Sequence, residues 1–220
     1  MVKVLELFSG TGSVGKCCKE LGWDVVSVDL LLPADHEVDI MHFDYKQYPK
    51  DEFDIIWASP PCTSFSILQG SWIGRCKRVD GELVLFTEEQ RQKDMIDGDK
   101  LVKKTLEIID YFDCVNWFME NPQSGKLKDR EIMKNIPFYD VDYCKYSDWG
   151  YRKRTRIWTN KKDFNNLMCD CDCGYTVGKK HINNLGNANW KEDGKNKSKN
   201  YGQTEKYRIP EDLIYSLFLD

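Results

Sequence analysis

The chain has 220 residues, of which 41% are hydrophobic and 31% charged, with 32 Lys and Arg residues against 36 Asp and Glu residues. These values are close to globular averages, so they exclude a disordered or fibrous chain and predict one ordinary domain with its own core. The longest apolar runs are strand-length, far short of the roughly 20 residues of a membrane span. We therefore expect no association with a membrane.

Nine cysteines are spread along the chain, and no secretory leader is recognisable at its start. The odd count and the low density are unlike a disulfide scaffold. We therefore expect an intracellular, reducing compartment and no secretion. Each thiol is then interpreted singly, as core filler, metal ligand or nucleophile.

Strand and helix patterns alternate through the first two thirds of the chain. A strand at 4–8 leads into Gly10-Thr11-Gly12-Ser13-Val14-Gly15 and a helix at 16–21. Further strands are predicted at 23–32, 53–58 and 114–119, with an amphipathic helix at 101–112. This alternation predicts an α/β fold with a doubly wound, mostly parallel sheet.

The alternation stops after Asn160. Residues 164–203 are rich in Asn, Lys, Gly and Asp and have few periodic apolar positions, which predicts a small irregular subdomain. A closing helix is expected at 209–218, with Pro210 in its first turn. We predict a core at 1–159, a small segment at 160–206 and a C-terminal helix at 207–220 that packs back on the core.

Basic residues are concentrated late in the chain. Between Lys145 and Arg208 there are 15 Lys and Arg residues against 7 acidic residues, so the remainder of the chain is acidic. A basic flank of this kind suits contact with a polyanion such as nucleic acid. A solvated, Lys-rich and Asn-rich loop is the alternative, and charge alone does not separate the two.

The glycine-rich segment suggests a cofactor site. Gly10-x-Gly12-x-x-Gly15 follows the first strand at once, and Asp29 ends the second strand. Glycines let the backbone approach a ligand at a helix N-terminus, and an acid on the next strand can accept hydrogen bonds from ribose hydroxyls. We expect a nucleoside-containing cofactor, the alternative being a tight packing turn. No Gly-Lys-Ser/Thr follows, so a P-loop is excluded.

Three further motifs carry reactive side chains. Ser59-Pro60-Pro61-Cys62 begins where a strand ends, and its prolines would hold one thiol at the top of the sheet. Glu120 follows the strand at 114–119, so a carboxyl group would arrive beside that thiol. Arg152-x-Arg154-x-Arg156 would place three guanidiniums on one face of an extended segment.

The ordered series Phe8-x-Gly10-x-Gly12, Pro60-Pro61-Cys62, Glu120-Asn121 and Arg154-x-Arg156 resembles the motifs of the DNA cytosine-5 methyltransferases. The resemblance spans Leu5 to Ile157, and four motifs in order are more specific than any one of them. It implies a Rossmann-like class I methyltransferase fold, S-adenosylmethionine as cofactor, DNA as partner and methylation of carbon 5 of cytosine.

The resemblance also assigns roles to individual residues. Cys62 would add to carbon 6 of cytosine, Glu120 would protonate ring nitrogen 3, and Arg154 with Arg156 would orient the base. Since carbon 6 is inaccessible inside a duplex, the target base would be flipped out. The cofactor would be held by the residues of the turn, the ribose acid, the adenine pair and the proline before the nucleophile, namely Phe8, Gly10, Gly12, Asp29, Asp39, Ile40 and Pro61.

One departure from the family pattern affects target recognition. Only about 50 residues, 160–207, occupy the place of the family's large target-recognition domain, and so short a segment delivers few side chains to base edges. Three explanations are open: relaxed specificity, help from a protein partner, or an inactive enzyme. A methyltransferase acting on RNA or a free cytosine nucleotide, and a catalytically silent nucleic-acid-binding accessory subunit, are the alternative functions.

The same segment contains Cys169-x-Cys171-x-Cys173, with His181 further on. Structural zinc takes four tetrahedral ligands, commonly with two to four residues between paired cysteines, so this alternation departs from the usual pattern. Cys169, Cys171, Cys173 and His181 are candidate zinc ligands in a segment with little core of its own. Surface thiols in a loop are the alternative.

Overall fold

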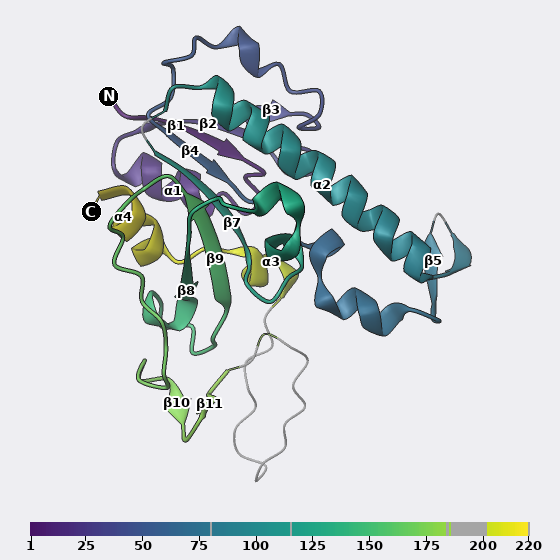
Figure 1. The fold of residues 1–220 in the computed structure, drawn as a ribbon. Coiled ribbons are helices and arrows are strands. Elements are labelled where there is room, and N and C mark those ends of the chain that lie inside the picture. Colours follow the sequence, from purple (N-terminus) through teal and green to yellow (C-terminus); the bar gives the residue numbers. More distant parts are fainter. Residues whose placement is uncertain (80, 115, 184, 186–201, 220) are drawn as a thin grey trace.

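A seven-stranded sheet is central to the computed structural model, which describes residues 1–79, 81–114, 116–183, 185 and 202–219 (Figure 1). The strand order is β3-β2-β1-β4-β7-β9-β8. The first five strands in this order are parallel, and β9 is antiparallel to both of its neighbours. The strands are β1 (Lys3–Leu7), β2 (Asp24–Asp29), β3 (His36–Glu37), β4 (Ile55–Ala58), β7 (Asn116–Pro122), β8 (Phe138–Asp142) and β9 (Arg154–Thr159). The predicted mostly parallel α/β sheet is confirmed.

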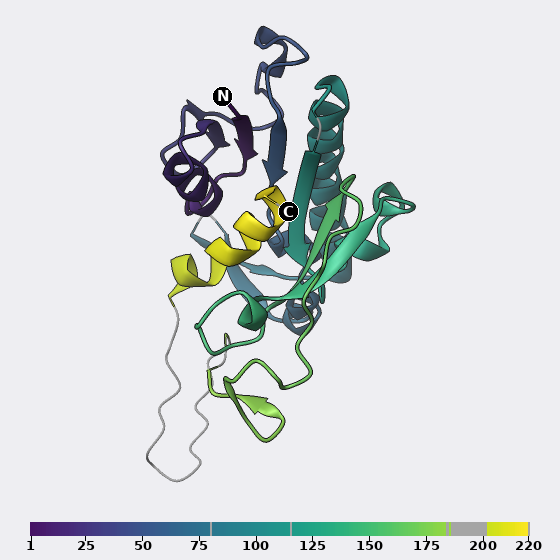
Figure 2. The ribbon, with the colours of Figure 1, turned by 90° about the vertical axis from the view of Figure 1, so that its left-hand side faces the viewer.

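Helices cover both faces of this sheet. Figure 2 shows α1 (Ser13–Glu20) and α4 (Glu211–Leu219) on one face and α2 (Glu88–Tyr111) on the other. Each face has its own buried cluster, one with Val14 of α1 and Leu213 of α4, the other with Val102 of α2. The central parallel strands β1, β4 and β7 are therefore buried on both sides, which explains their nearly continuous apolar sequences.

Helix α2 begins much earlier than its apolar spacing predicts. The hydroxyl of Thr87 accepts a hydrogen bond of 3.2 Å from the backbone N–H of Gln90, and Glu88 and Glu89 occupy the positive end of the helix. Gly98 faces the turn after Cys62, where a Cβ would lie 2.8 Å from the ring of Phe65. The first half of α2 therefore packs through few buried residues, Met95 and Gly98, which form no apolar stripe in the sequence.

Strand β7 extends further than predicted. Its pairing with β4 ends at Met119, but β9 continues to pair with Glu120, Asn121 and Pro122. Glu120 therefore lies within the strand, and the antiparallel register decides which face of the sheet receives its side chain.

The segment after β9 has little regular structure. It contains β10 (Thr176–Val177) and β11 (Lys180–His181), and α3 (Gln203–Tyr207) precedes α4. Much of the predicted 160–206 segment, including most of its Lys-rich and Asn-rich part, lies outside the described residues. A second hairpin, β5 (Cys76–Val79) and β6 (Glu82–Leu85), projects beside the start of α2 (Figure 1). Within the described ranges, no helix is both long and apolar enough to cross a membrane.

Candidate active site

The predicted cofactor residues gather at one edge of the sheet. Phe8, Gly10 and Gly12 lie in the turn after β1, Asp29 ends β2, and Pro61 follows β4. Asp39 and Ile40 follow β3, so all seven lie at the carboxyl ends of neighbouring parallel strands. Open α/β sheets bind ligands at this edge.

The turn after β1 has an unusual backbone. Phe8, Gly10 and Gly12 have φ values of 56°, 53° and 67°, in the left-handed region that a phenylalanine rarely adopts. A Cβ on Gly12 would meet nothing within 4 Å, so the space over this glycine is open. Such strain at a strand end is typical of functional turns, and here it leaves room for a ligand beside the backbone.

Asp29 stabilises the glycine turn directly. One of its oxygens accepts a hydrogen bond of 2.9 Å from the N–H of Gly10, and the other accepts from the N–H groups of Leu31 and Leu32 at 2.8 and 2.9 Å. A carboxylate offers about four acceptor positions. Three are used here, so one acceptor position remains.

Gly15 serves a different purpose from Gly10 and Gly12. Its N–H donates a hydrogen bond of 3.1 Å to Glu6, and a Cβ at this position would lie 2.7 Å from the same carboxylate oxygen. Glu6 is only 3% exposed. Burial raises the pKa of Glu6 to about 7, although hydrogen bonds from the start of α1 oppose the shift. Gly15 is therefore required by a buried carboxyl group beneath the turn.

Cys62 begins a short helical turn, residues Thr63–Phe65, directly after β4 and Pro60-Pro61. Its backbone carbonyl accepts a hydrogen bond of 3.1 Å from the N–H of Phe65, which is buried against α2. Asn121 of β7 donates a side-chain hydrogen bond of 2.8 Å to the carbonyl of Pro60. The segment that carries the thiol is thus attached to β7 and packs on α2.

Glu120 is the centre of a buried polar group. The hydroxyl of Tyr143 donates to one of its oxygens at 3.2 Å, and the ammonium of Lys153 lies 3.7 Å from the same oxygen. The Lys153 ammonium also lies 4.8 Å from the centre of the Tyr143 ring. Burial raises the pKa of Cys62, the charge of Glu120 raises it further, and Lys153 lowers it. The thiol, the carboxyl group and the ammonium therefore interact electrostatically.

The two predicted catalytic arginines occupy a different place. Arg154 forms a two-pronged ion pair with Asp142 at 3.0 and 2.7 Å, and Arg156 forms the same pair with Asp140 at 2.7 and 2.8 Å. Glu120 pairs in register with Ile157, so Arg154 and Arg156 project from the opposite face of the sheet. Arg152 is exposed and precedes β9. Both guanidiniums are thus held by carboxylates of β8, and their catalytic role stays a prediction.

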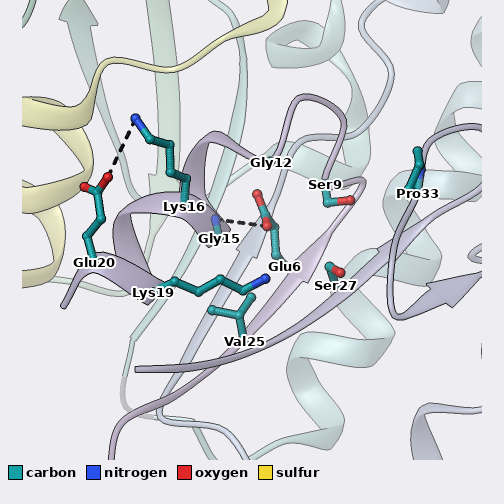
Figure 3. A pocket seen from close by; sticks show the side chains of 10 residues that line it. All are labelled: Glu6, Ser9, Gly12, Gly15, Lys16, Lys19, Glu20, Val25, Ser27 and Pro33. Atoms are coloured by element: carbon teal, nitrogen blue, oxygen red, sulfur yellow. Dashed lines mark hydrogen bonds and ion pairs between the residues drawn. The ribbon is translucent and has the colours of Figure 1, made fainter. Parts of the chain in front are cut away.

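Two cavities border the glycine turn. The first, of about 500 Å³, lies on the α1 side of β1 and β2 (Figure 3) and is lined in part by Glu6, Lys19 and Val25. The second, of about 800 Å³, lies between Gly12, the segment 145–149 and the start of α4. Both touch the turn through Gly12, but neither is lined by Asp29.

The candidate zinc ligands are partly brought together. Cys169, Cys173 and His181 lie in one cluster, and Cys144 takes the place predicted for Cys171. The backbone of Cys171 is left-handed, with φ 63°. Cys144 has no partner nearby in the sequence, so spacing could not have found it.

Sequence reasoning also missed Lys153, Tyr143 and Gly98. Lys153 lies between Arg152 and Arg154 in the arginine motif. Period-two alternation places its side chain on the face opposite to the arginines. Knowing which face meets Glu120 requires the strand register.

A mostly parallel sheet with one antiparallel strand next to its edge, and a glycine turn after β1, defines a Rossmann-like class I methyltransferase. Over 171 residues the chain is 43% identical to a Frog virus 3 (isolate Goorha) protein named "Probable DNA (cytosine-5)-methyltransferase", covering 76% of this chain and 75% of the relative. The chain belongs to the DNA (cytosine-5)-methyltransferase family, which confirms the resemblance of its motifs and the predicted class of enzyme.

Solved structures with related folds share much less sequence. The Entamoeba histolytica methyltransferase EhMeth is 16% identical, with a TM-score of 0.48, and the match covers 77% of this chain and 56% of that one. The S. pombe Dnmt2 methyltransferase is 13% identical, with a TM-score of 0.40, over 74% of this chain and 50% of that one. This chain spans about half the length of these structures. No family model matches the chain.

Proposed function

We propose that this protein transfers a methyl group from S-adenosylmethionine to carbon 5 of cytosine in DNA, with Cys62 as the nucleophile. The observation that supports this most directly is the electrostatic group of Cys62, Glu120 and Lys153 at the edge of the sheet that also carries the glycine turn. A half-buried thiol beside a buried carboxyl group is poorly explained as core packing, because the carboxyl group loses hydration there.

The residues at this edge fit the cofactor. Gly12 leaves open space over the turn, and Asp29 retains one acceptor position for a ribose hydroxyl. Asp39 and Ile40 are proposed to contact the adenine. Phe8 and Gly10, in the turn, are proposed to line the cofactor, and Pro61 to lie between cofactor and target. When bound, S-adenosylmethionine supplies an electrophilic methyl group.

The chain's own groups then perform the remaining steps. The Cys62 sulfur adds to carbon 6 of cytosine, and Glu120 in its acid form gives a proton to ring nitrogen 3, so electron density moves to carbon 5, which takes the methyl group. A water molecule then removes the carbon 5 proton and ring nitrogen 3 returns its proton to Glu120, so the double bond between carbons 5 and 6 forms again and the Cys62 thiolate leaves. Lys153 stabilises the thiolate, since its charge lowers the pKa of Cys62.

Arg154 and Arg156 are proposed to act as positioning residues. Their ion pairs with Asp142 and Asp140 join β9 to β8, the two elements that lead to Lys153 and Tyr143. These pairs also neutralise part of the basic flank, so fewer cations remain to meet DNA than the sequence suggests.

The substrate is proposed to be duplex DNA with the target cytosine flipped out, because Cys62 must reach carbon 6 from one face of the ring. Because the segment after β9 is short, we also propose that a separate protein partner contributes to target recognition.

The deciding experiment is transfer of tritiated methyl from S-adenosylmethionine to mixed-sequence duplex DNA. The parent protein and Cys76→Ala, which removes an exposed thiol on β5, should label the DNA, whereas Cys62→Ala should not. Single-stranded DNA and RNA serve as competitors.

A duplex containing 5-fluorocytosine gives a second readout, because fluorine at carbon 5 blocks the final elimination and traps the Cys62 adduct. Label that survives Cys62→Ala would exclude Cys62 as the nucleophile. No label from a parent protein that binds the cofactor would overturn the proposed function.

A further inference from the structure

A buried cluster of four ligand-type side chains lies outside the candidate active site. Nε2 of His181 is 3.2 Å from Sγ of Cys144, 3.4 Å from Sγ of Cys173 and 3.6 Å from Sγ of Cys169. All four ligand atoms lie within 4.8 Å of one another. Cys144 and Cys169 are buried, and the other two are half-buried.

These separations match a tetrahedral metal site. Zinc binds sulfur at about 2.3 Å and histidine nitrogen at about 2.0 Å, which places a tetrahedral sulfur and nitrogen about 3.6 Å apart. The set is three cysteines and one histidine, a common composition of structural zinc sites. Cys169 and Cys173 have three residues between them, within the usual spacing, whereas the alternating pattern that includes Cys171 is not.

The surrounding segment is joined to β8 and the residues after it by hydrogen bonds such as that from Leu167 N–H to the Tyr146 hydroxyl, but it has almost no hydrophobic core of its own. Among residues 160–183 only Phe164 and Cys169 are buried, and the β10–β11 hairpin has two residues in each strand. A hairpin of this size is not stable by its own hydrogen bonds. A metal would supply the missing stabilisation.

The cluster also joins this segment to the active site. Cys144 directly follows Tyr143, whose hydroxyl donates to Glu120. On the other side, the N–H of Cys169 donates a hydrogen bond of 2.9 Å to Asp142, the partner of Arg154. Fixing Cys144 and Cys169 would therefore fix the hydrogen bond from Tyr143 to Glu120 and the ion pair between Asp142 and Arg154.

We propose that Cys144, Cys169, Cys173 and His181 bind one structural zinc ion, which anchors the segment after β9 to the end of β8. The metal lies apart from Cys62 and takes no part in methyl transfer.

Zinc content of the protein, purified under reducing conditions without chelators and measured by mass spectrometry of the metal, tests this directly. The parent protein should carry one zinc per chain. In competition with a chelator, Cys144→Ser should bind zinc at least about tenfold more weakly than the parent, since loss of an outer hydrogen bond to a ligand already costs about that much affinity.

Cys171→Ser is the matched control, because it removes a thiol from the same loop but not from the cluster, and it should keep the parent's zinc. A parent protein without zinc after incubation with the ion would overturn the proposal. Loss of zinc from Cys171→Ser, with retention by Cys144→Ser, would also overturn it and favour the ligand set expected from spacing alone.

Cobalt binding to the parent protein keeps the test independent of any variant that fails to fold. Cobalt in the proposed site should show tetrahedral d–d absorption and thiolate-to-metal charge transfer, and zinc should displace it. An octahedral spectrum without thiolate bands would contradict the proposal. Neither readout depends on methyl transfer, so this proposal and the proposed function fail separately.

Discussion

The side-chain amide of Asn121 donates a hydrogen bond of 2.8 Å to the carbonyl of Pro60, which ties β7 to the segment that carries Cys62. Two motifs that are 61 residues apart in the sequence are thus joined by one buried contact. The position of the thiol relative to Glu120, the residue before Asn121, depends on this bond.

Asn121→Ala should therefore impair methyl transfer through the position of Cys62. We expect kcat to fall by about tenfold or more, with little change in the KM for S-adenosylmethionine, because a small displacement of a reacting group is costly. Loss of the bond should also lower the free energy of unfolding by about 1–3 kcal/mol. Asn116→Ala, at the other end of β7, is the control. An unchanged kcat would show that this bond does not position the nucleophile.

The reactivity of Cys62 should depend on its two charged neighbours in opposite directions. Glu120 raises the pKa of Cys62 and Lys153 lowers it. Glu120→Gln should therefore speed alkylation of Cys62 by iodoacetamide at pH 7.5, and Lys153→Met should slow it, each by about threefold or more, since one unit of pKa is a tenfold change in thiolate. Peptide mass spectrometry follows Cys62, with the exposed Cys76 as internal reference. Equal rates in all three proteins would contradict the proposed electrostatic group.

Glu6 should make stability depend on pH. Its pKa is raised from 4.5 to about 7, so between these values the folded state binds more protons than the unfolded chain. The free energy of unfolding therefore falls as pH rises through this window and levels off above pH 7. Relative to Glu6→Gln, the parent protein should lose about 3 kcal/mol between pH 4.5 and pH 8. Urea unfolding measures this, and Glu37→Gln should retain the parent's slope. Parallel curves for the parent and Glu6→Gln would refute the assignment.

Arg156 should contribute to stability through its fixed geometry. Its guanidinium pairs with Asp140 and lies 3.5 Å from the centre of the Phe138 ring. A lysine cannot form both contacts, so Arg156→Lys should lower the free energy of unfolding by about 1–2 kcal/mol. Arg152→Lys, at an exposed position, should change it by less than about 0.5 kcal/mol.

A double-mutant cycle with Asp140→Asn separates positioning from a direct catalytic role of Arg156. If Arg156 acts through Asp140, the two substitutions together should lower methyl transfer little more than either alone. Independent losses that multiply, with the larger one from Arg156→Lys, would show that Arg156 contacts the substrate directly.

Much of the candidate site could be predicted because strand ends are local features. Gly10, Asp29 and Cys62 each follow an apolar run, and parallel strands bring their carboxyl ends to one edge. The packing of the first half of α2 could not be predicted in this way. Gly98 lies against the turn after Cys62 because it has no side chain, and such a contact leaves no apolar pattern in the sequence.

By itself the sequence determined the alternation of strands and helices, the mostly parallel sheet and the edge where Phe8, Asp29 and Cys62 meet, since these follow from local periodicity and from the chirality of strand connections. It did not indicate β3, β8 or the antiparallel pairing of β9. Only the tertiary structure decided that Lys153, and not Arg154, contacts Glu120, and that Cys144 joins Cys169, Cys173 and His181. Each case has its own physical reason. A one-residue change in strand register exchanges the two faces of a sheet, and contacts between distant segments leave no spacing in the sequence.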